Sequence, residues 1–136
     1  MKKFIFLSLA IVIVQFVKAQ VMPAKPQWAT IKSANLHCWE CKERLDRYLL
    51  TENNANFDNG MLKWNYNLIN GEIKVYFLPD RVTVDDIRTA MNNAGFDADS
   101  TKAEPLEYKR LPPSCKLISE GGGPKKGQPC HLPPNN

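Results

Sequence analysis

The sequence predicts an α+β domain in which one four-stranded antiparallel sheet carries two helices on a single face. Three observations lead to this fold class. Apolar and polar residues alternate from Leu62 to Leu68, and Asn70-Gly71 then precedes a second strand-like run, which is a hairpin pattern. One stretch with helical spacing lies on each side of this hairpin. Strand-forming residues precede the first helical stretch and follow the second.

The first strand and first helix are expected before the hairpin. Strand-forming residues predominate over residues 28–33, which begin at Trp28. After the loop of residues 34–37, apolar side chains recur every three or four residues from Trp39 to about Thr51, which predicts a helix. The apolar positions of this helix are Cys41, Leu45, Tyr48 and Leu49.

The hairpin is the clearest local pattern. A period of two places alternate residues of the first strand on one buried face, and the return strand over residues 72–78 repeats the pattern. Asn70-Gly71 favours a type I′ turn, in which both central residues have positive φ. The expected buried side chains are Leu62, Trp64, Tyr66 and Leu68 on the first strand, and Ile73, Val75 and Phe77 on the second.

A second helix and a last strand are expected after the hairpin. Thr83 is a suitable N-cap, Asp85 and Asp86 favour the first turn, and Gly95 is a suitable left-handed terminator. Residues 96–102 then predict a short fourth strand. The order strand, helix, strand, strand, helix, strand is the ferredoxin-like βαββαβ plan. The apolar stripe of the second helix is Val84, Ile87, Ala90, Met91 and Ala94.

The two ends of the chain differ from this central domain. Residues 1–19 have a basic start, an apolar centre and a small-residue end at Ala19, which predicts a secretory signal peptide rather than a membrane anchor. Residues 20–27 are expected to be a leader. Residues 104–136 contain seven of the ten prolines and predict an irregular tail rich in proline and glycine. The mature protein is therefore expected to be periplasmic or secreted, without a stable membrane anchor.

The charge balance argues against nucleic acid as a partner. The chain has 18 basic and 14 acidic residues. Residues 1–19 hold three lysines and no acidic residue, so 15 basic and 14 acidic residues follow them. Nucleic-acid binding normally requires a clustered basic face, and this balance provides no sign of one.

Cys38 and Cys41 form a CxxC motif between the first strand and the first helix. Two cysteines at a helix start can direct their sulfur atoms to one place, and the positive end of the helix lowers the pKa of their thiols. Thiolates prefer soft metal ions such as Cu(I) and Zn(II). The motif therefore predicts a metal site with Cys38 and Cys41 as ligands.

The region from Trp28 to Lys102 resembles the heavy-metal-associated domain family, which includes periplasmic mercuric-ion-binding proteins and copper chaperones. The resemblance rests on residues 35–41 (NLHCWEC), on the Asn70-Gly71 hairpin and on the residues from Ile87 to Phe96. It implies a domain over residues 28–103 with Cys38 and Cys41 as ligands of Cu(I), with Hg(II) or Zn(II) as alternatives. It also implies a metal transporter or another metal-carrying protein as the partner.

Two positions depart from the usual family pattern Gly-Met-x-Cys-x-x-Cys. Asn35 replaces the glycine, and we expect this residue to be tolerated because asparagine adopts unusual backbone angles more readily than most residues. Leu36 replaces the methionine, and we expect it to fill the same buried position.

The CxxC motif has other interpretations. Cys38 and Cys41 could form a structural disulfide in an interaction module, or the redox pair of a thiol–disulfide oxidoreductase. His37 could be a third ligand, although an exposed loop histidine is the simpler interpretation. We favour extracytoplasmic binding of a soft metal ion, for sequestration or transfer, and we do not predict an enzyme.

Two further cysteines lie in the tail, outside the region of resemblance. Cys115 and Cys130 are separated by a glycine-rich segment that can bring its ends together. We expect a disulfide between them, since the predicted compartment is oxidising. The alternative is a second soft-metal site made of Cys115, Cys130 and His131.

Overall fold

The computed structural model describes residues 24–134, so the predicted signal peptide and half of the leader lie outside the described residues. The order strand, helix, strand, strand, helix is confirmed. The elements are β1 (Gln27–Lys32), α2 (Trp39–Ala55), β2 (Met61–Asn67), β3 (Glu72–Phe77), α3 (Val84–Asn93), α4 (Pro105–Lys109) and the short 3-10 helices η2 (Pro113–Cys115) and η3 (Ile118–Glu120).

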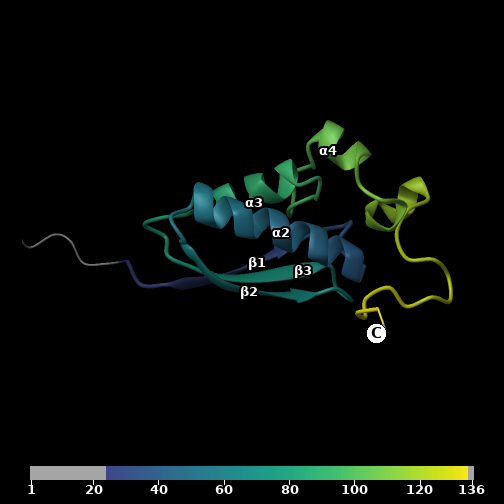
Figure 1. The fold of residues 1–136 in the computed structure, drawn as a ribbon, viewed down its shortest axis with the longest axis horizontal. Helices are drawn as coiled ribbons and strands as arrows, with labels where there is room; N and C mark the ends of the chain where they lie inside the picture. The colour runs from purple at the N-terminus through teal and green to yellow at the C-terminus, as the bar shows by residue number, and fades with distance from the viewer. Residues whose placement is uncertain (1–23, 135–136) are drawn as a thin grey trace, which may run out of the picture.

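The sheet has three antiparallel strands in the order β1-β3-β2, and α2 and α3 cover one of its faces (Figure 1). β3 is the central strand, and its alternate residues Ile73, Val75 and Phe77 are buried, as their period of two predicts. The helices contribute Leu45, Leu49, Ile87 and Met91 to the same core.

The prediction of a fourth strand over residues 96–102 is wrong. This segment forms an isolated bridge between Ala98 and Thr101, with Asp99 between them at a φ of 52°. The Asp99 carboxylate accepts a hydrogen bond from the Lys32 backbone N–H (2.9 Å), and the Asp99 N–H donates to the Lys32 carbonyl (2.7 Å). The side chain of Asp99 therefore provides one of the bonds that a neighbouring strand would provide from its backbone.

Two details of the predicted hairpin differ in the structure. The pairing of β2 with β3 shifts between Met61 and Lys63, which is a bulge, and Leu62 is consequently 47% exposed instead of facing the core. Of the two turn residues, Gly71 has a positive φ of 65° and Asn70 does not, so the turn is not of type I′. Residues 68–71 form a longer connection between the two strands.

The start and end of α3 agree with the prediction. Thr83 accepts a hydrogen bond from the Asp86 N–H, and the Asp86 carboxylate accepts one from the Thr83 N–H, which is a capping box. The Thr83 hydroxyl also donates to the Asp86 carboxylate (2.7 Å), and this bond together with the one from the Thr83 N–H lowers the pKa of the Asp86 carboxyl group. Gly95 follows the helix with a φ of 93°, a conformation that glycine adopts without steric cost.

The tail returns to the domain and packs against it. After α4 the chain passes through η2 and η3, and its last described residues lie near the start of α2 (Figure 1). Leu111 and Cys115 of this tail are buried in the main core. Among residues 24–134, none of the helices has the length and apolar character needed to span a bilayer.

The sheet face opposite α2 and α3 carries aromatic and basic side chains. Trp28 and Tyr76 are direct cross-strand neighbours with ring centroids 4.8 Å apart. The Lys63 ammonium lies 5.2 Å from both ring centroids, and that of Lys74 lies 4.9 Å from the Trp28 ring. These cation–π contacts cover the rings partly with lysine side chains of the same molecule.

Candidate functional site

Cys38 and Cys41 lie at the start of α2, as the sequence predicts. Cys38 is the N-cap residue, with an extended backbone (φ −107°, ψ 152°), and its side chain makes no capping hydrogen bond. Its carbonyl accepts hydrogen bonds from the N–H groups of Cys41 and Lys42, both at 3.1 Å. Both cysteines are buried within the same core, at the end of the helix where the backbone dipole is positive.

Both cysteines are bonded to the tail. Cys38 forms a disulfide with Cys130, and Cys41 forms one with Cys115. The predicted pairing of Cys115 with Cys130 is therefore wrong, and the CxxC cysteines are not bonded to each other. No cysteine among residues 24–134 is a free thiol in this state.

Backbone and side-chain contacts hold the tail on the start of α2. The Trp39 N–H donates to the Cys130 carbonyl at 2.6 Å, so the tail caps one of the amide groups that a helix start leaves without a partner. The Ser114 hydroxyl donates to the Glu40 carboxylate at 2.8 Å. The pairing of the cysteines follows from this docking, because it places Cys115 and Cys130 next to the motif and not next to each other.

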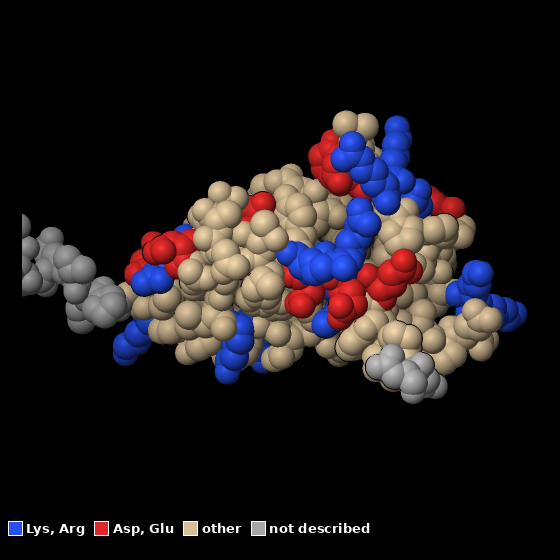
Figure 2. Space-filling view, in the orientation of Figure 1, with Lys and Arg blue, Asp and Glu red and all other residues tan. Residues whose placement is uncertain are grey.

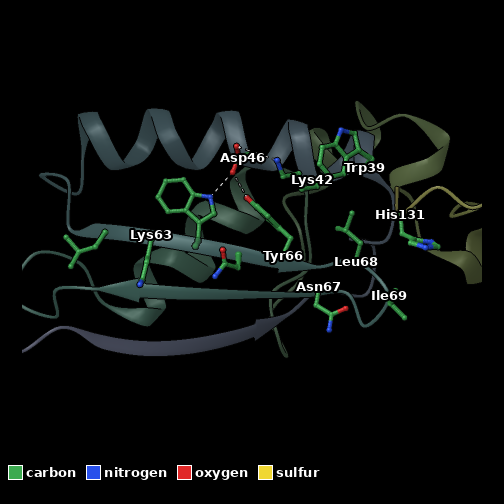
Figure 3. A pocket seen from close by; sticks show the side chains of 12 residues that line it. Trp39, Lys42, Asp46, Lys63, Tyr66, Asn67, Leu68, Ile69 and His131 are labelled. Atoms are coloured by element: carbon green, nitrogen blue, oxygen red, sulfur yellow. Dashed lines mark hydrogen bonds and ion pairs between the residues drawn. The ribbon is translucent and has the colours of Figure 1, made fainter. Parts of the chain in front are cut away.

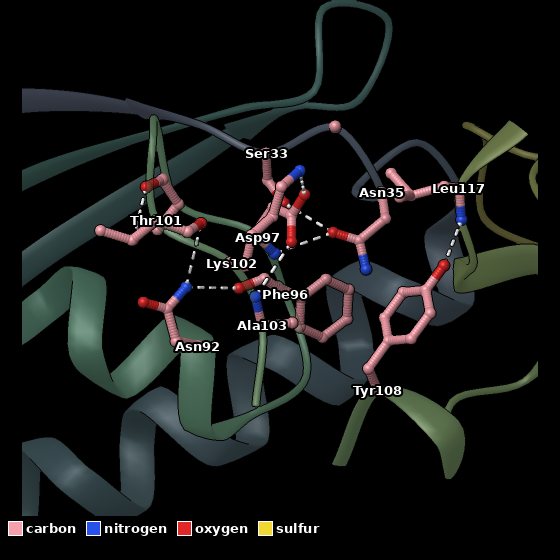
Figure 4. A network of polar contacts seen from close by, with 12 residues as sticks. Ser33, Asn35, Asn92, Phe96, Asp97, Thr101, Lys102, Ala103, Tyr108 and Leu117 are labelled. Atoms are coloured by element: carbon pink, nitrogen blue, oxygen red, sulfur yellow. Dashed lines mark hydrogen bonds and ion pairs between the residues drawn. The ribbon is translucent and has the colours of Figure 1, made fainter. Parts of the chain in front are cut away.

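Asn35, whose side-chain oxygen contacts Ser33 and Asp97 (Figure 4), also connects the loop before Cys38 to the tail. Its amide group donates to the carbonyls of Gly95 (3.1 Å) and Cys115 (2.9 Å). Its side-chain oxygen accepts hydrogen bonds from the Ser33 hydroxyl (3.1 Å) and the Asp97 N–H (3.0 Å). Asn35 is 1% exposed, so these four contacts satisfy a fully buried amide.

The expectation that Asn35 adopts an unusual backbone conformation is wrong. Asn35 is not among the residues with positive φ, and its side chain carries its role. Leu36, expected to be buried, is 0% exposed.

The two histidines are not arranged as metal ligands in this state. The ring nitrogens of His37 lie 3.2 Å from the carbonyls of Leu68 and Ala34, and a neutral ring donates a hydrogen bond to only one of these two acceptors. His131 follows Cys130 and is half-buried at the edge of a neighbouring groove. Within the described residues, no group of three or more ligating side chains is placed to hold a metal ion.

A groove of about 900 Å³ lies between α2 and β2, and Trp39 and His131, the residues that follow Cys38 and Cys130, line it (Figure 3). Asp46 accepts hydrogen bonds from the Trp64 indole (2.7 Å) and the Tyr66 hydroxyl (3.1 Å). Burial raises the pKa of Tyr66, and the nearby Asp46 charge raises it further. The Lys42 ammonium lies 4.7 Å from the Trp39 ring centroid.

The sequence interpretation missed Asp46. Its spacing of four residues from Lys42 is the pattern that would have predicted an ion pair on one helix face, and the structure has this pair at 4.0 Å. Trp64 and Tyr66, expected in the core, are half-buried and donate hydrogen bonds to Asp46 of α2. Basic and acidic side chains are mixed over the face shown in Figure 2, so no single sign of charge dominates this face.

Cys38 and Cys41 provide no thiolate while they are in disulfides. A sulfur atom in a disulfide has no thiolate to donate, and the thiolate is the form that binds metal. Reduction of each disulfide by a dithiol transfers two electrons and two protons and leaves two thiols. Metal binding then releases the thiol protons.

Part of this chain is similar to a protein of known structure. No protein-family model matches this chain, and no curated protein matches it. The chain is similar to a solved structure described as "CopZ metallochaperone", with 24% sequence identity and a TM-score of 0.45. The match covers 53% of this chain and 98% of that chain. This similarity is too weak to decide either the fold or the function.

Proposed function

We propose that this protein binds a soft metal ion, Cu(I) in the first place, through the thiolates of Cys38 and Cys41 after the two disulfides are reduced. The observation that carries this proposal is the position of both cysteines at the first turn of α2. The amide groups of a helix start favour negative charge, and they therefore favour the thiolate forms that soft ions bind.

The biological role that fits this site is sequestration or transfer of the ion outside the cytoplasm, with Hg(II) or Zn(II) as alternative cargo. A metal transporter or another metal-carrying protein would be the partner. The protein would not be an enzyme. The two disulfides would keep the site closed until a dithiol reductant opens them.

An anaerobic titration with Cu(I), followed by native mass spectrometry, tests the proposal on the mature chain. The reduced protein should bind one ion, and the oxidised protein should bind none. Cys38→Ser or Cys41→Ser should lower the affinity of the reduced protein by orders of magnitude, because a hydroxyl is a poor ligand for a soft ion. Ser119→Ala, a change at an exposed serine of the same tail, is the matched control and should bind as the unaltered protein does.

The structure also supports a second candidate, an interaction module that the disulfides stabilise. All four cysteines are bonded, and Cys38, Cys41 and Cys115 are at most 2% exposed, as expected for structural disulfides. This candidate predicts that the reduced protein binds no ion. A reduced chain without Cu(I) affinity, or an oxidised chain that binds Cu(I) equally well, would overturn the proposed metal function.

A thiol–disulfide oxidoreductase is less well supported than it was by the sequence alone. Such enzymes cycle a disulfide within the CxxC motif. Here Cys38 and Cys41 each bond to a distant tail residue instead. If the protein is not an oxidoreductase, it should reduce a model disulfide no faster than a free thiol does.

A further inference from the structure

We infer that Cys130 is a thiolation site, at which the thiolate of a small external thiol attacks the Cys130 sulfur atom and releases Cys38 as a thiolate. The Cys41–Cys115 disulfide does not take part in this step. The consequence for metal binding rests on the proposed function, whereas the exchange step itself requires no metal.

Burial distinguishes Cys130 from the other three cysteines. Cys41 and Cys115 are 0% exposed and Cys38 is 2% exposed, whereas Cys130 is partly exposed. Thiol–disulfide exchange requires the attacking thiolate to reach one sulfur atom of the bond. In the folded protein the Cys38–Cys130 bond is therefore open to attack from the side of Cys130, and the Cys41–Cys115 bond is protected on both sides.

The two tail cysteines also differ in how the surrounding chain holds them. The Cys115 carbonyl accepts a hydrogen bond from the buried Asn35 amide at 2.9 Å, and Leu111, four residues earlier, lies in the core. Cys130 lies between residues 124–129 and 132–134, all of which are exposed. Segments of this kind move most easily, so the chain around Cys130 can give way to an incoming thiol.

The start of α2 suits Cys38 as the leaving group. Cys38 is the N-cap residue of this helix, and in the disulfide its sulfur atom makes no capping hydrogen bond. An N-cap side chain is placed to accept hydrogen bonds from N–H groups of the first turn, where negative charge is favourable. The thiolate that leaves can therefore accept hydrogen bonds that the disulfide does not make, and this favours release of Cys38.

The step is an exchange in which atoms and electrons balance. The incoming sulfur atom forms a new bond to the Cys130 sulfur atom, the bond to Cys38 breaks, and its electron pair leaves with Cys38. A second small thiolate can then attack the bound thiol and release Cys130. Two small thiols together supply the two electrons that reduce the original bond, and they leave as a small-molecule disulfide.

The product is a half-reduced protein, in which Cys38 is free while Cys41 remains bonded to the buried Cys115. Under the proposed function this species offers one of the two thiolates that the ion needs. A small thiol would therefore prepare the site without opening it, and the second thiolate would require exposure of the core around Cys115.

The experiment uses the full mature chain in its oxidised state, without metal, and glutathione is the probe. The reaction is stopped at increasing times with excess maleimide, and the modified and linked cysteines are identified by peptide mapping. We expect glutathione on Cys130, maleimide on Cys38 and an intact link between Cys41 and Cys115. In concentrated urea, which removes the protection by burial, both disulfides should react at similar rates. Glutathione on Cys38, no adduct in the folded protein, or equally fast attack on both disulfides of the folded protein would overturn the inference.

A pair of matched variants isolates each bond. Cys41→Ala/Cys115→Ala retains the Cys38–Cys130 bond alone, and Cys38→Ala/Cys130→Ala retains the Cys41–Cys115 bond alone. The first should react with glutathione at least about tenfold faster than the second, because access limits the exchange rate. Equal rates would count against the inference, and the mapping of the unaltered protein decides the matter if a variant does not fold.

The two proposals fail on different results. Both glutathione measurements are made without metal, so an unreactive Cys130 would overturn the thiolation site and leave the proposed function standing. A fully reduced chain that binds no Cu(I) would overturn the proposed function and leave the exchange at Cys130 intact.

Discussion

At the scale of single residues, Asn35 is the position where a side chain does most to organise the site. Its amide holds the Cys115 carbonyl of the tail and the Gly95 carbonyl after α3, while its oxygen accepts from Ser33 and Asp97. The contacts span as many as 80 residues of sequence, so one amide joins three separate segments beside the cysteines.

Asn35→Asp should therefore destabilise the fold by about 3 kcal/mol at neutral pH, because two buried carbonyls lose their donors and face a carboxylate instead. Urea unfolding of the oxidised protein measures this loss. The deficit should shrink as the pH falls, since the protonated carboxyl group can donate one hydrogen bond again. Asn65→Asp, an exposed change of the same chemistry on β2, should cost less than about 0.5 kcal/mol. Equal losses in the two variants would show that the hydrogen bonds of Asn35 do not contribute to the free energy of unfolding.

The alternation of apolar and polar residues predicted the buried side chains of β3 correctly, but it did not predict the exposed Leu62 of β2. Ile73, Val75 and Phe77 are buried because a period of two needs only regular pleating to be correct. Leu62 has the same period and is exposed, because one bulge shifts the register at that point. A bulge depends on the pairing of two strands, and the alternation within one strand carries no information about it.

At the scale of elements, α3 shows how much local sequence can specify. Its capping box, its apolar stripe and its glycine terminator all lie within a few residues of one another in the sequence. The predicted fourth strand lacked such local support. Asp97 and Asp99 bond to the backbone with their side chains, and this turns residues 97–103 into a compact connection.

Thr83→Ala tests the contribution of the capping box. The variant leaves the Asp86 N–H without its acceptor, and we expect a loss of about 1 kcal/mol in the free energy of unfolding. Thr89→Ala is the matched control, because Thr89 lies inside the same helix with its hydroxyl bonded to the Asp85 carbonyl. Alanine is the better helix former there, so this change should be neutral or slightly stabilising in the same urea experiment. A loss at Thr89 as large as that at Thr83 would contradict the capping argument.

At the scale of the whole molecule, the two disulfides join the C-terminal tail to the start of α2, near the N-terminal end of the domain. They link residues separated by 92 and 74 positions. The sequence allowed three pairings of four cysteines, and the short glycine-rich segment favoured the pairing of Cys115 with Cys130. That reasoning failed because it treated the tail as separate from the domain, whereas docking of the tail decides which cysteines meet.

Removing each disulfide should destabilise the oxidised protein by about 2–5 kcal/mol, and the two losses should differ. The double variant Cys41→Ala/Cys115→Ala should lose more than Cys38→Ala/Cys130→Ala. The reason is that Cys41 and Cys115 are fully buried in the core, while Cys130 is only half-buried. Urea unfolding without reductant provides the comparison. A larger loss for the Cys38–Cys130 pair would place the main cross-link at the end of the tail instead.

The way the tail is fastened also determines what a protease could release. Lys125 and Lys126 are exposed in the segment between Cys115 and Cys130, in a stretch of polar and glycine residues of the kind that proteases cut first. A cut there would produce two polypeptides, but the Cys38–Cys130 bond would keep the smaller one attached. The nicked molecule would run as one species without reductant and as two with it. An oxidised chain that has lost its continuity in this segment therefore still keeps all four sulfur atoms at the start of α2.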